Sequence, residues 1–395
     1  MKKVIDVPGF RFSGITAGIK KSKKKDLALI SSENEAVVAG VFTTNRIKAA
    51  PVLLNISRLK RKKGRAILIN SGNANACTGQ QGMQDAREMA LLTAKELGIP
   101  STSVYVSSTG VIGKPLPMQK IRKAILHAVK NLSPHAFREV ASAIMTTDTF
   151  PKTVLKQLTV AGRKGTIAGI AKGAGMICPS MATMLSYIVT DIAVEPAALD
   201  TLLRDAVNRS FNRLTIDNDM STNDTVLMMA NGFLGNKPIG RKSPFYTTFK
   251  KALYEITYDL SKQIAMDGEG ATKLIEVTVK GARTESDAEK AAKSIAQSLL
   301  VKTAVYGQNL NWGRIMAAIG YSGAFIRENK ITVFLNNHKT VKNGTGVDTG
   351  RNLGKLLSDK SITITVDLGV GKKEAKVLTC DLTEKYVKIN ADYMT

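Results

Sequence analysis

The sequence is poor in the side chains that bind metals and form disulfides. It has three cysteines and three histidines among 395 residues. Cys77, Cys178 and Cys380 are far apart and form no Cys-x-x-Cys motif. Their odd number and wide spacing argue against a zinc site or a disulfide framework, and they favour a reducing compartment. We therefore expect no metal and no cofactor.

Long apolar runs and a secretory signal are also missing. No uninterrupted apolar segment reaches the ~20 residues that a membrane-spanning helix needs. Asp6 and Pro8 interrupt the stretch after Lys2 and Lys3, where a signal peptide would have its apolar region. We expect a cytoplasmic protein with no membrane partner.

Aromatic and acidic residues are scarce relative to basic ones. Aromatics are 5% of the chain, and 57 Lys and Arg face 32 Asp and Glu, for a net charge of +25. This excess raises the question of nucleic-acid binding. The basic clusters, such as Lys20–Lys25 and Lys60–Lys63, are not interleaved with aromatics and lie between apolar runs, where hairpin turns are expected. We interpret them as solvated loops and expect no nucleic-acid partner.

Apolar residues are abundant, at 44%, and a chain of this length is expected to form two domains. Short apolar segments over 26–56 predict antiparallel strands, and 153–160 with 166–171 predict a hairpin. A helical pattern over 84–97 ends at Gly98, a good C-cap. Further strands are expected at 66–70, 104–106, 184–194, 225–230, 272–279, 331–335, 361–367 and 375–381, and helices at 119–132, 136–145, 196–210, 244–266 and 287–300.

These elements mix strands and helices without strict βαβ alternation. The predicted fold class is therefore α/β, with layered mixed or antiparallel sheets and helices in two domains, rather than a doubly wound nucleotide fold. The expected structural boundary lies near 268–286, before a C-terminal α/β domain.

The most informative segment is the Gly-rich loop Lys172–Leu185. A phosphate-binding interpretation fails because Lys172 precedes the glycines, whereas a Walker loop places Gly-Lys-Ser/Thr at its end. A dinucleotide fingerprint also fails, because Cys178 stands where a third small residue is needed and Pro179 interrupts the following helix. We expect no nucleotide site here.

Thr183 in this loop is a candidate nucleophile. A threonine hydroxyl is activated when its own free amine acts as the base, which requires Thr183 to be the first residue of a chain. The sequence thus suggests self-cleavage after the small residue Ala182. On the local pattern alone, a threonine that simply opens a buried strand is the more ordinary interpretation. Thr109-Gly110 could donate to the developing oxyanion, or form a type II turn.

Several motifs together resemble the glutamate/ornithine N-acetyltransferase family of arginine biosynthesis, over almost the whole chain. Their joint presence in this order carries the resemblance. They are the segments 41–51, 70–79, 108–113, 145–149, 172–183, 221–225, 267–273, 311–314 and 389–395.

The resemblance implies a self-processing precursor, cut between Ala182 and Thr183 into an α chain, 1–182, and a β chain, 183–395, associated as α2β2. It implies a ping-pong acetyl transfer from N2-acetyl-L-ornithine to L-glutamate through an acetyl group on Thr183. Acetyl-coenzyme A is left open as a second donor.

The resemblance also implies roles for individual residues. Thr109 and Gly110 would form the oxyanion hole, Lys172 would pair with the substrate α-carboxylate, and Glu269 would bind the side-chain amine of ornithine. The substrate contacts that it implies are Thr149, Lys172, Thr183, Glu269, Asn390 and Thr395. A related self-cleaving aminopeptidase or amidase, which passes the acyl group to water, is the alternative function.

Overall fold

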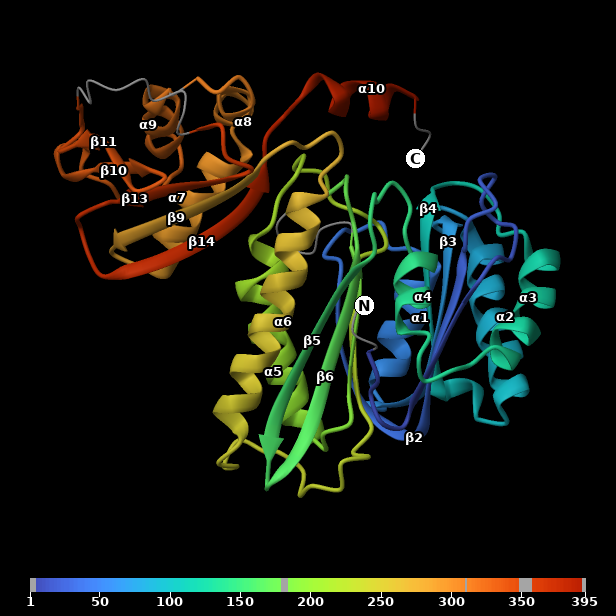
Figure 1. Cartoon of the computed structure of the whole chain (residues 1–395). Helices are drawn as coiled ribbons and strands as arrows, with labels where there is room; N and C mark the ends of the chain where they lie inside the picture. The colour runs from blue at the N-terminus through green and yellow to red at the C-terminus, as the bar shows by residue number, and fades with distance from the viewer. Residues whose placement is uncertain (1–4, 179–183, 310, 348–356, 393–395) are drawn as a thin grey trace.

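The computed structural model describes residues 5–178, 184–309, 311–347 and 357–392 (Figure 1). The predicted cleavage site, Ala182-Thr183, and the predicted contact Thr395 lie outside the described residues.

The larger sheet has eight strands in the order β4-β3-β2-β8-β7-β6-β5, with β1 paired to β2. The β3–β4 and β7–β8 pairs are parallel and the others antiparallel. Its strands are β1 (Phe10–Ile15), β2 (Leu27–Phe42), β3 (Lys63–Asn73), β4 (Val104–Val111), β5 (Lys152–Val160), β6 (Arg163–Lys172), β7 (Leu185–Thr190) and β8 (Thr225–Ala230).

Strand β2 divides this sheet into two halves that face each other. Its first part pairs with β1 and β3, and its last part pairs with β8, with a register shift between Ser31 and Ala36. Between the halves lies one apolar core, with Ile67 and Ile69 from one side and Tyr187 and Met229 from the other. The central strands β7 and β8 are buried at every residue, which explains their continuous apolar runs.

Helices cover the outer face of each half (Figure 1). On one side α5 (Pro196–Arg209) and α6 (Tyr246–Met266) pack on β5, β6 and β2. On the other side α2 (Gly79–Leu97), α3 (Met118–Lys130) and α1 (Ala50–Leu59) share a core with β3 and β4. Helix α4 (Phe137–Ala143) packs mainly on β1. The result is a four-layer arrangement of helices, two half-sheets and helices.

A second, six-stranded sheet follows, in the order β12-β11-β10-β13-β9-β14. Helix α7 (Glu285–Gln297) packs on β9 and β14, and α10 (Glu384–Asp392) returns from this sheet toward the larger one (Figure 1). The remaining elements are β9 (Leu274–Ala282), β10 (Thr332–Leu335), β11 (His338–Lys342), β12 (Thr345–Gly346), β13 (Ser361–Asp367), β14 (Lys373–Cys380), α8 (Leu299–Tyr306), α9 (Trp312–Gly320) and 3-10 turns at Ser101–Ser103, Phe211–Arg213 and Glu328–Lys330.

The predicted fold class, α/β with layered mixed sheets and helices, is confirmed. The strands predicted throughout 26–56 were partly wrong, because β2 ends at Phe42 and α1 begins at Ala50. Pro51 stands in the first turn of α1, and the buried residues of this helix, at 50, 51, 52, 54 and 55, include the pairs 50/54 and 51/55 at helical spacing. The helix predicted over 287–300 is two helices, because Ser298 caps the start of α8.

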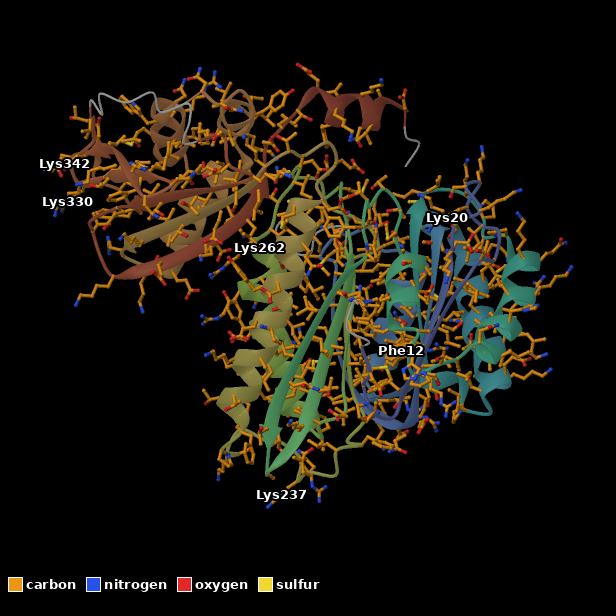
Figure 2. The ribbon with its side chains drawn as sticks, in the orientation of Figure 1. Phe12, Lys20, Lys237, Lys262, Lys330 and Lys342 are labelled. Atoms are coloured by element: carbon orange, nitrogen blue, oxygen red, sulfur yellow. The ribbon has the colours of Figure 1, made fainter. Side chains whose placement is uncertain are left out.

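Basic side chains are spread over distant parts of the surface. Figure 2 shows Lys237 at one end of the larger sheet, Lys20 near the other, and Lys330 and Lys342 on the second sheet. Lys20–Lys25 does link two antiparallel strands, β1 and β2, but Lys60–Lys63 was wrongly placed at a hairpin turn and instead joins α1 to β3. None of the described helices has the length and apolar character to cross a membrane.

Candidate active site

The strand ends of the two half-sheets meet at one end of the larger sheet. Lys172 at the end of β6 pairs with Leu185 at the start of β7, which pairs with Thr225 at the start of β8. Thr109 and Gly110 lie near the end of β4. Because β2 folds the sheet over, these segments from both halves border one pocket.

The pocket has a volume of about 300 Å³. Five of the residues predicted for the site line it, namely Thr109, Gly110, Lys172, Glu269 and Asn390. The other polar residues around it are Thr146, Thr147, Asp217, Asp219, Ser221, Asn223 and Tyr386. Sequence spacing could not bring these segments together, but the folded sheet does.

Gly110 occupies a position that only glycine fits. Its φ is +131°, and a Cβ there would lie 2.4 Å from the backbone carbon of Gly72 on the neighbouring strand. Thr109 and Gly110 thus belong to a strand in close contact with β3, and the turn that was the alternative interpretation is wrong.

Lys172 brings a buried cation to the pocket. Its Nζ donates to the hydroxyl of Thr146 at 2.7 Å and lies 3.5 Å from the hydroxyl oxygen of Thr109. Burial lowers the pKa of Lys172, and the nearby carboxylate of Asp148 opposes that shift. Its ammonium is held by hydroxyls, so its positive charge can still pair with an anionic group entering the pocket.

A buried network of charged side chains, formed by Lys152, Asp148 and Asp267, lies next to Lys172 on the side away from the pocket. Lys152 Nζ lies 2.7 Å from Asp148 and 2.5 Å from Asp267, and all three side chains are almost fully buried. Asp148 also accepts the N–H of Gly173 at 2.7 Å, which fixes the backbone directly after Lys172. Burial would raise the pKa of Asp148, but the charges of Lys172 and Lys152 lower it to about 2.

Thr149 lies beside this network rather than in the pocket lining. Its N–H donates to Asp267 at 3.0 Å, and its hydroxyl donates to the same carboxylate. A substrate could therefore use only the acceptor capacity of this hydroxyl.

A second carboxylate lies across the pocket from the strand ends. Asn390 on α10 donates to Glu269 Oε2 at 2.8 Å, and the N–H of Glu269 donates to Ala174 at 2.7 Å. A Cβ on Gly175 would lie 2.3 Å from the Glu269 carboxylate, so a larger residue there would displace that carboxylate. Lys172 brings a positive group to the pocket, and Glu269 with Asp217 and Asp219 brings negative ones, which suits a substrate bearing both charges.

Two adjacent side chains connect the segments on either side of the pocket. Asn223 Nδ2 donates to the carbonyl of Ser108 at 2.8 Å, and Asp224 Oδ1 accepts the N–H of Met184 at 2.9 Å. Ser108 and Met184 are the immediate sequence neighbours of Thr109 and Thr183. The segments that carry the predicted oxyanion donors and the predicted nucleophile are thus joined through two consecutive residues.

Sequence reasoning assigned no role to several residues of this site. Asp217 accepts the N–H groups of Met176 and Ile177 at 2.6 and 2.7 Å, so it shapes the Gly-rich loop. The hydroxyl of Tyr386 on α10 donates to the same carboxylate at 3.3 Å. The motifs containing Asp224 and Asp148 stood out in the sequence, but an acidic residue in a polar segment does not reveal that it will be buried.

The chain matches the family model described as the ArgJ family over residues 11–395. The chain belongs to this family. It is 51% identical to the arginine biosynthesis bifunctional protein ArgJ of Geobacter sulfurreducens over 393 residues, which cover 99% of this chain and 100% of that protein. It is also 51% identical to the protein of the same name from Caldanaerobacter subterraneus over 397 residues, covering 99% and 98%.

Among solved structures, the chain resembles the arginine biosynthesis bifunctional protein ArgJ of Bacillus halodurans. The sequences are 43% identical and the TM-score is 0.52, with 53% of this chain and 100% of that chain covered. As a member of the ArgJ family, this protein is an acetyltransferase of arginine biosynthesis.

Proposed function

We propose that this protein transfers the acetyl group of N2-acetyl-L-ornithine to L-glutamate through an acetyl ester on Thr183. The observation that carries the proposal is the pocket itself, which is lined by the buried Lys172, the partly exposed Glu269, Thr109 and Gly110. The hydrogen bonds of Asn223 and Asp224 support it, since they tie Met184 to this pocket.

The chain first cuts itself before Thr183. The Thr183 hydroxyl oxygen attacks the Ala182 carbonyl carbon, the C–N bond breaks as the C–O bond forms, and the hydroxyl proton ends on the released amine. Water then hydrolyses the ester, which gives an Ala182 carboxylate and restores the hydroxyl. The free α-amine, with an ordinary pKa of ~7.7–8.0, can serve as the base near neutral pH.

In the first half of the reaction, Thr183 attacks the acetyl carbonyl of N2-acetylornithine. Its hydroxyl proton passes through the α-amine to ornithine, which leaves as the amide C–N bond breaks. Thr109 and Gly110 donate to the oxyanion. In the second half, the amine of glutamate attacks the ester, and N-acetylglutamate leaves as the hydroxyl is restored.

The charged groups of the pocket select the substrates. Lys172 pairs with the α-carboxylate, and Glu269, held by Asn390, accepts from the side-chain ammonium of ornithine. Thr149 contributes through its acceptor capacity, and Thr395 is a further proposed contact. We also propose an α2β2 assembly of the two products in the cytoplasm.

The decisive experiment compares intact mass and acetyl transfer for the wild type, Thr183→Ala and Thr183→Ser. The wild type should separate into two polypeptides on denaturation and transfer acetyl to glutamate. Thr183→Ala should stay uncut and inactive, and Thr183→Ser should keep part of both activities because a hydroxyl and an α-amine remain. An uncut wild type with full activity contradicts the proposal.

The acceptor and the donor are tested in the same assay. Release of acetate in place of N-acetylglutamate, with glutamate present, would favour the alternative amidase function. Formation of N-acetylglutamate from acetyl-coenzyme A and glutamate, without acetylornithine, would add the second donor.

A further inference from the structure

Asp224 is a buried carboxyl group whose hydrogen bonding is incomplete. It lies at the start of β8 and is fully buried. Its Oδ1 accepts the N–H of Met184 at 2.9 Å, but its Oδ2 has no hydrogen-bond partner among the described residues. Buried polar atoms are almost always paired, so an unpaired carboxyl oxygen beside a pocket requires an explanation.

The hydroxyl of Thr43 lies near enough to Asp224 to lower the pKa of its carboxyl group, but it makes no hydrogen bond to Oδ2 in the structure. The hydroxyl of Thr43, at the end of β2, donates its proton to the carbonyl of Ser221 at 2.8 Å. Lys172 is the nearby cation, and its ammonium donates to the Thr146 hydroxyl instead. Burial raises the pKa of Asp224 well above its ordinary value, and the charge of Lys172 opposes this only in part.

The amide that Asp224 holds is the one that joins Thr183 to Met184. A carboxyl group anchored to that amide lies next to the residue where, under the proposed function, self-cleavage creates a new amine. An amide nitrogen before the cut becomes an ammonium or amine after it, and this new group is a strong donor. The unpaired oxygen of Asp224 would then accept a hydrogen bond from the α-amine that self-cleavage creates.

We propose that Asp224 is a positioning residue for Thr183. One carboxyl oxygen holds the amide that follows the nucleophile, and the other accepts from the α-amine that self-cleavage frees. This inference rests on the proposed function and deepens it, because it gives the freed amine a partner that orients it toward the Thr183 hydroxyl.

Other charged groups also face this region. They are Lys172 with Asp148 behind it, Asp217 and Asp219 from the loop before Asp224, and Glu269 across the pocket. The charge of Asp224 raises the pKa of Lys172, so a change at Asp224 also acts on that lysine. Loss of the Lys172 proton would appear in the falling limb of the kcat/KM profile at high pH, whereas the freed amine loses its proton in the rising limb. A shift of the rising limb of an Asp224 variant therefore reports the partnership between Asp224 and the amine.

Two substitutions separate the two functions of the carboxyl group. Asp224→Asn keeps an oxygen for the Met184 N–H but cannot ionise to pair with a protonated amine, so self-cleavage should persist. Its amine should lose about one pKa unit, because an opposite charge favours the protonated form. The rising limb of the kcat/KM profile should then move to lower pH by about one unit. Asp224→Ala also loses the anchor, and its cleavage should slow by about tenfold.

Asp191 provides the matched control, because it is a buried carboxyl at the opposite end of β7 that accepts the N–H of Thr166 at 2.7 Å. Asp191→Asn and Asp191→Ala should process and titrate as the wild type does. Intact mass measures the extent of cleavage at intervals after refolding from denaturant begins, and circular dichroism measures folding.

The possible results distinguish this inference from the function on which it rests. If the wild type is cut and active but both Asp224 variants are cut at its rate with an unshifted profile, the positioning role is wrong and the proposed function stands. An uncut, active wild type overturns both. If Asp224→Ala fails to fold, the pH profile of Asp224→Asn alone decides.

Discussion

The two ends of the β6–β7 pair use the same local interaction for different purposes. At one end Asp191 accepts the N–H of Thr166, and at the other Asp224 accepts the N–H of Met184. At the first end the hydroxyl of Thr190 also donates to the Thr166 carbonyl and accepts the N–H of Ile192. The second adds buried Lys172 and the network behind it.

This comparison teaches that a buried carboxyl group alone does not mark the end of the sheet that carries the candidate active site. Both carboxyl groups are buried, and burial raises the pKa of each. What distinguishes the end with the candidate site is a buried cation, Lys172, whose charge is only partly neutralised. Such an arrangement is costly for folding and useful for binding anionic substrates.

The largest effect should come from removing the centre of the network. Lys152→Met leaves Asp148 and Asp267 buried without their shared cation, so the free energy of unfolding should fall by about 3–5 kcal/mol. Chemical denaturation at neutral pH measures this. Lys156→Met is the control, because Lys156 on the same strand forms only partly exposed ion pairs and should cost at most about 1 kcal/mol. Equal losses of unfolding free energy in Lys152→Met and Lys156→Met would show that the buried network stabilises the fold no more than partly exposed ion pairs do.

A second effect concerns binding. Lys172→Met removes the charge that we propose pairs with substrate carboxylates. KM for both substrates should then rise about 10- to 100-fold, since a charge-assisted hydrogen bond contributes ~1.5–3 kcal/mol. Steady-state kinetics with each substrate varied in turn provides the test. Lys20→Met removes a neighbouring cation that donates to the Lys25 carbonyl and should leave KM unchanged. A similar KM rise in both variants would mean that the general positive field, not Lys172, binds the substrates.

Acid should lower the free energy of unfolding by protonating Asp148. The pKa of Asp148 is about 2 in the folded protein and ~3.9 when unfolded, so its contribution of about 2 kcal/mol is complete above about pH 4. It is lost as the pH falls from about 4 toward 2. The stability difference between the wild type and Asp148→Asn should therefore shrink between pH 5 and pH 3 in denaturation experiments. A stability difference that stays constant between pH 5 and pH 3 would contradict the lowered pKa of Asp148.

The smallest effect should come from the other end of the pair. Because burial raises the pKa of Asp191, its ionised form opposes folding, and a neutral amide removes that cost. Asp191→Asn should change stability by less than about 1 kcal/mol and should leave acetyl transfer unaltered. Thermal melting and the transfer assay measure both. A loss of activity would show that the two ends are coupled.

Much of the fold could be predicted because buried core strands have apolar sequences that can be recognised without a structure. β8 was placed at 225–230 because an uninterrupted apolar run is typical of a strand buried on both faces. The second helix ended where Gly98 predicted it, in a left-handed conformation with φ of +63°. By contrast, α10 has no buried residue in this chain, so its nine residues gave no apolar stripe to detect.

The site was predictable only in part, for a physical reason. Local pattern found Thr183 and the Gly-rich loop, and the resemblance supplied Lys172, Glu269 and Asn390, which the structure brings to one pocket. The roles of these residues, and the boundary expected near 268–286, stay predictions. Asp224 and Asp148 were missed as individual groups, because their importance comes from burial by strands distant in the sequence.

The strand order has a consequence for the fate of a cut chain. β7 and β8 follow the predicted cleavage point, yet they lie between β2 and β6, which precede it. The two products would therefore be interleaved, with one inserted through the middle of the other's sheet. Separating them would break two strand pairings and open the shared core, so processing creates a new chain end without creating a new subunit that can leave.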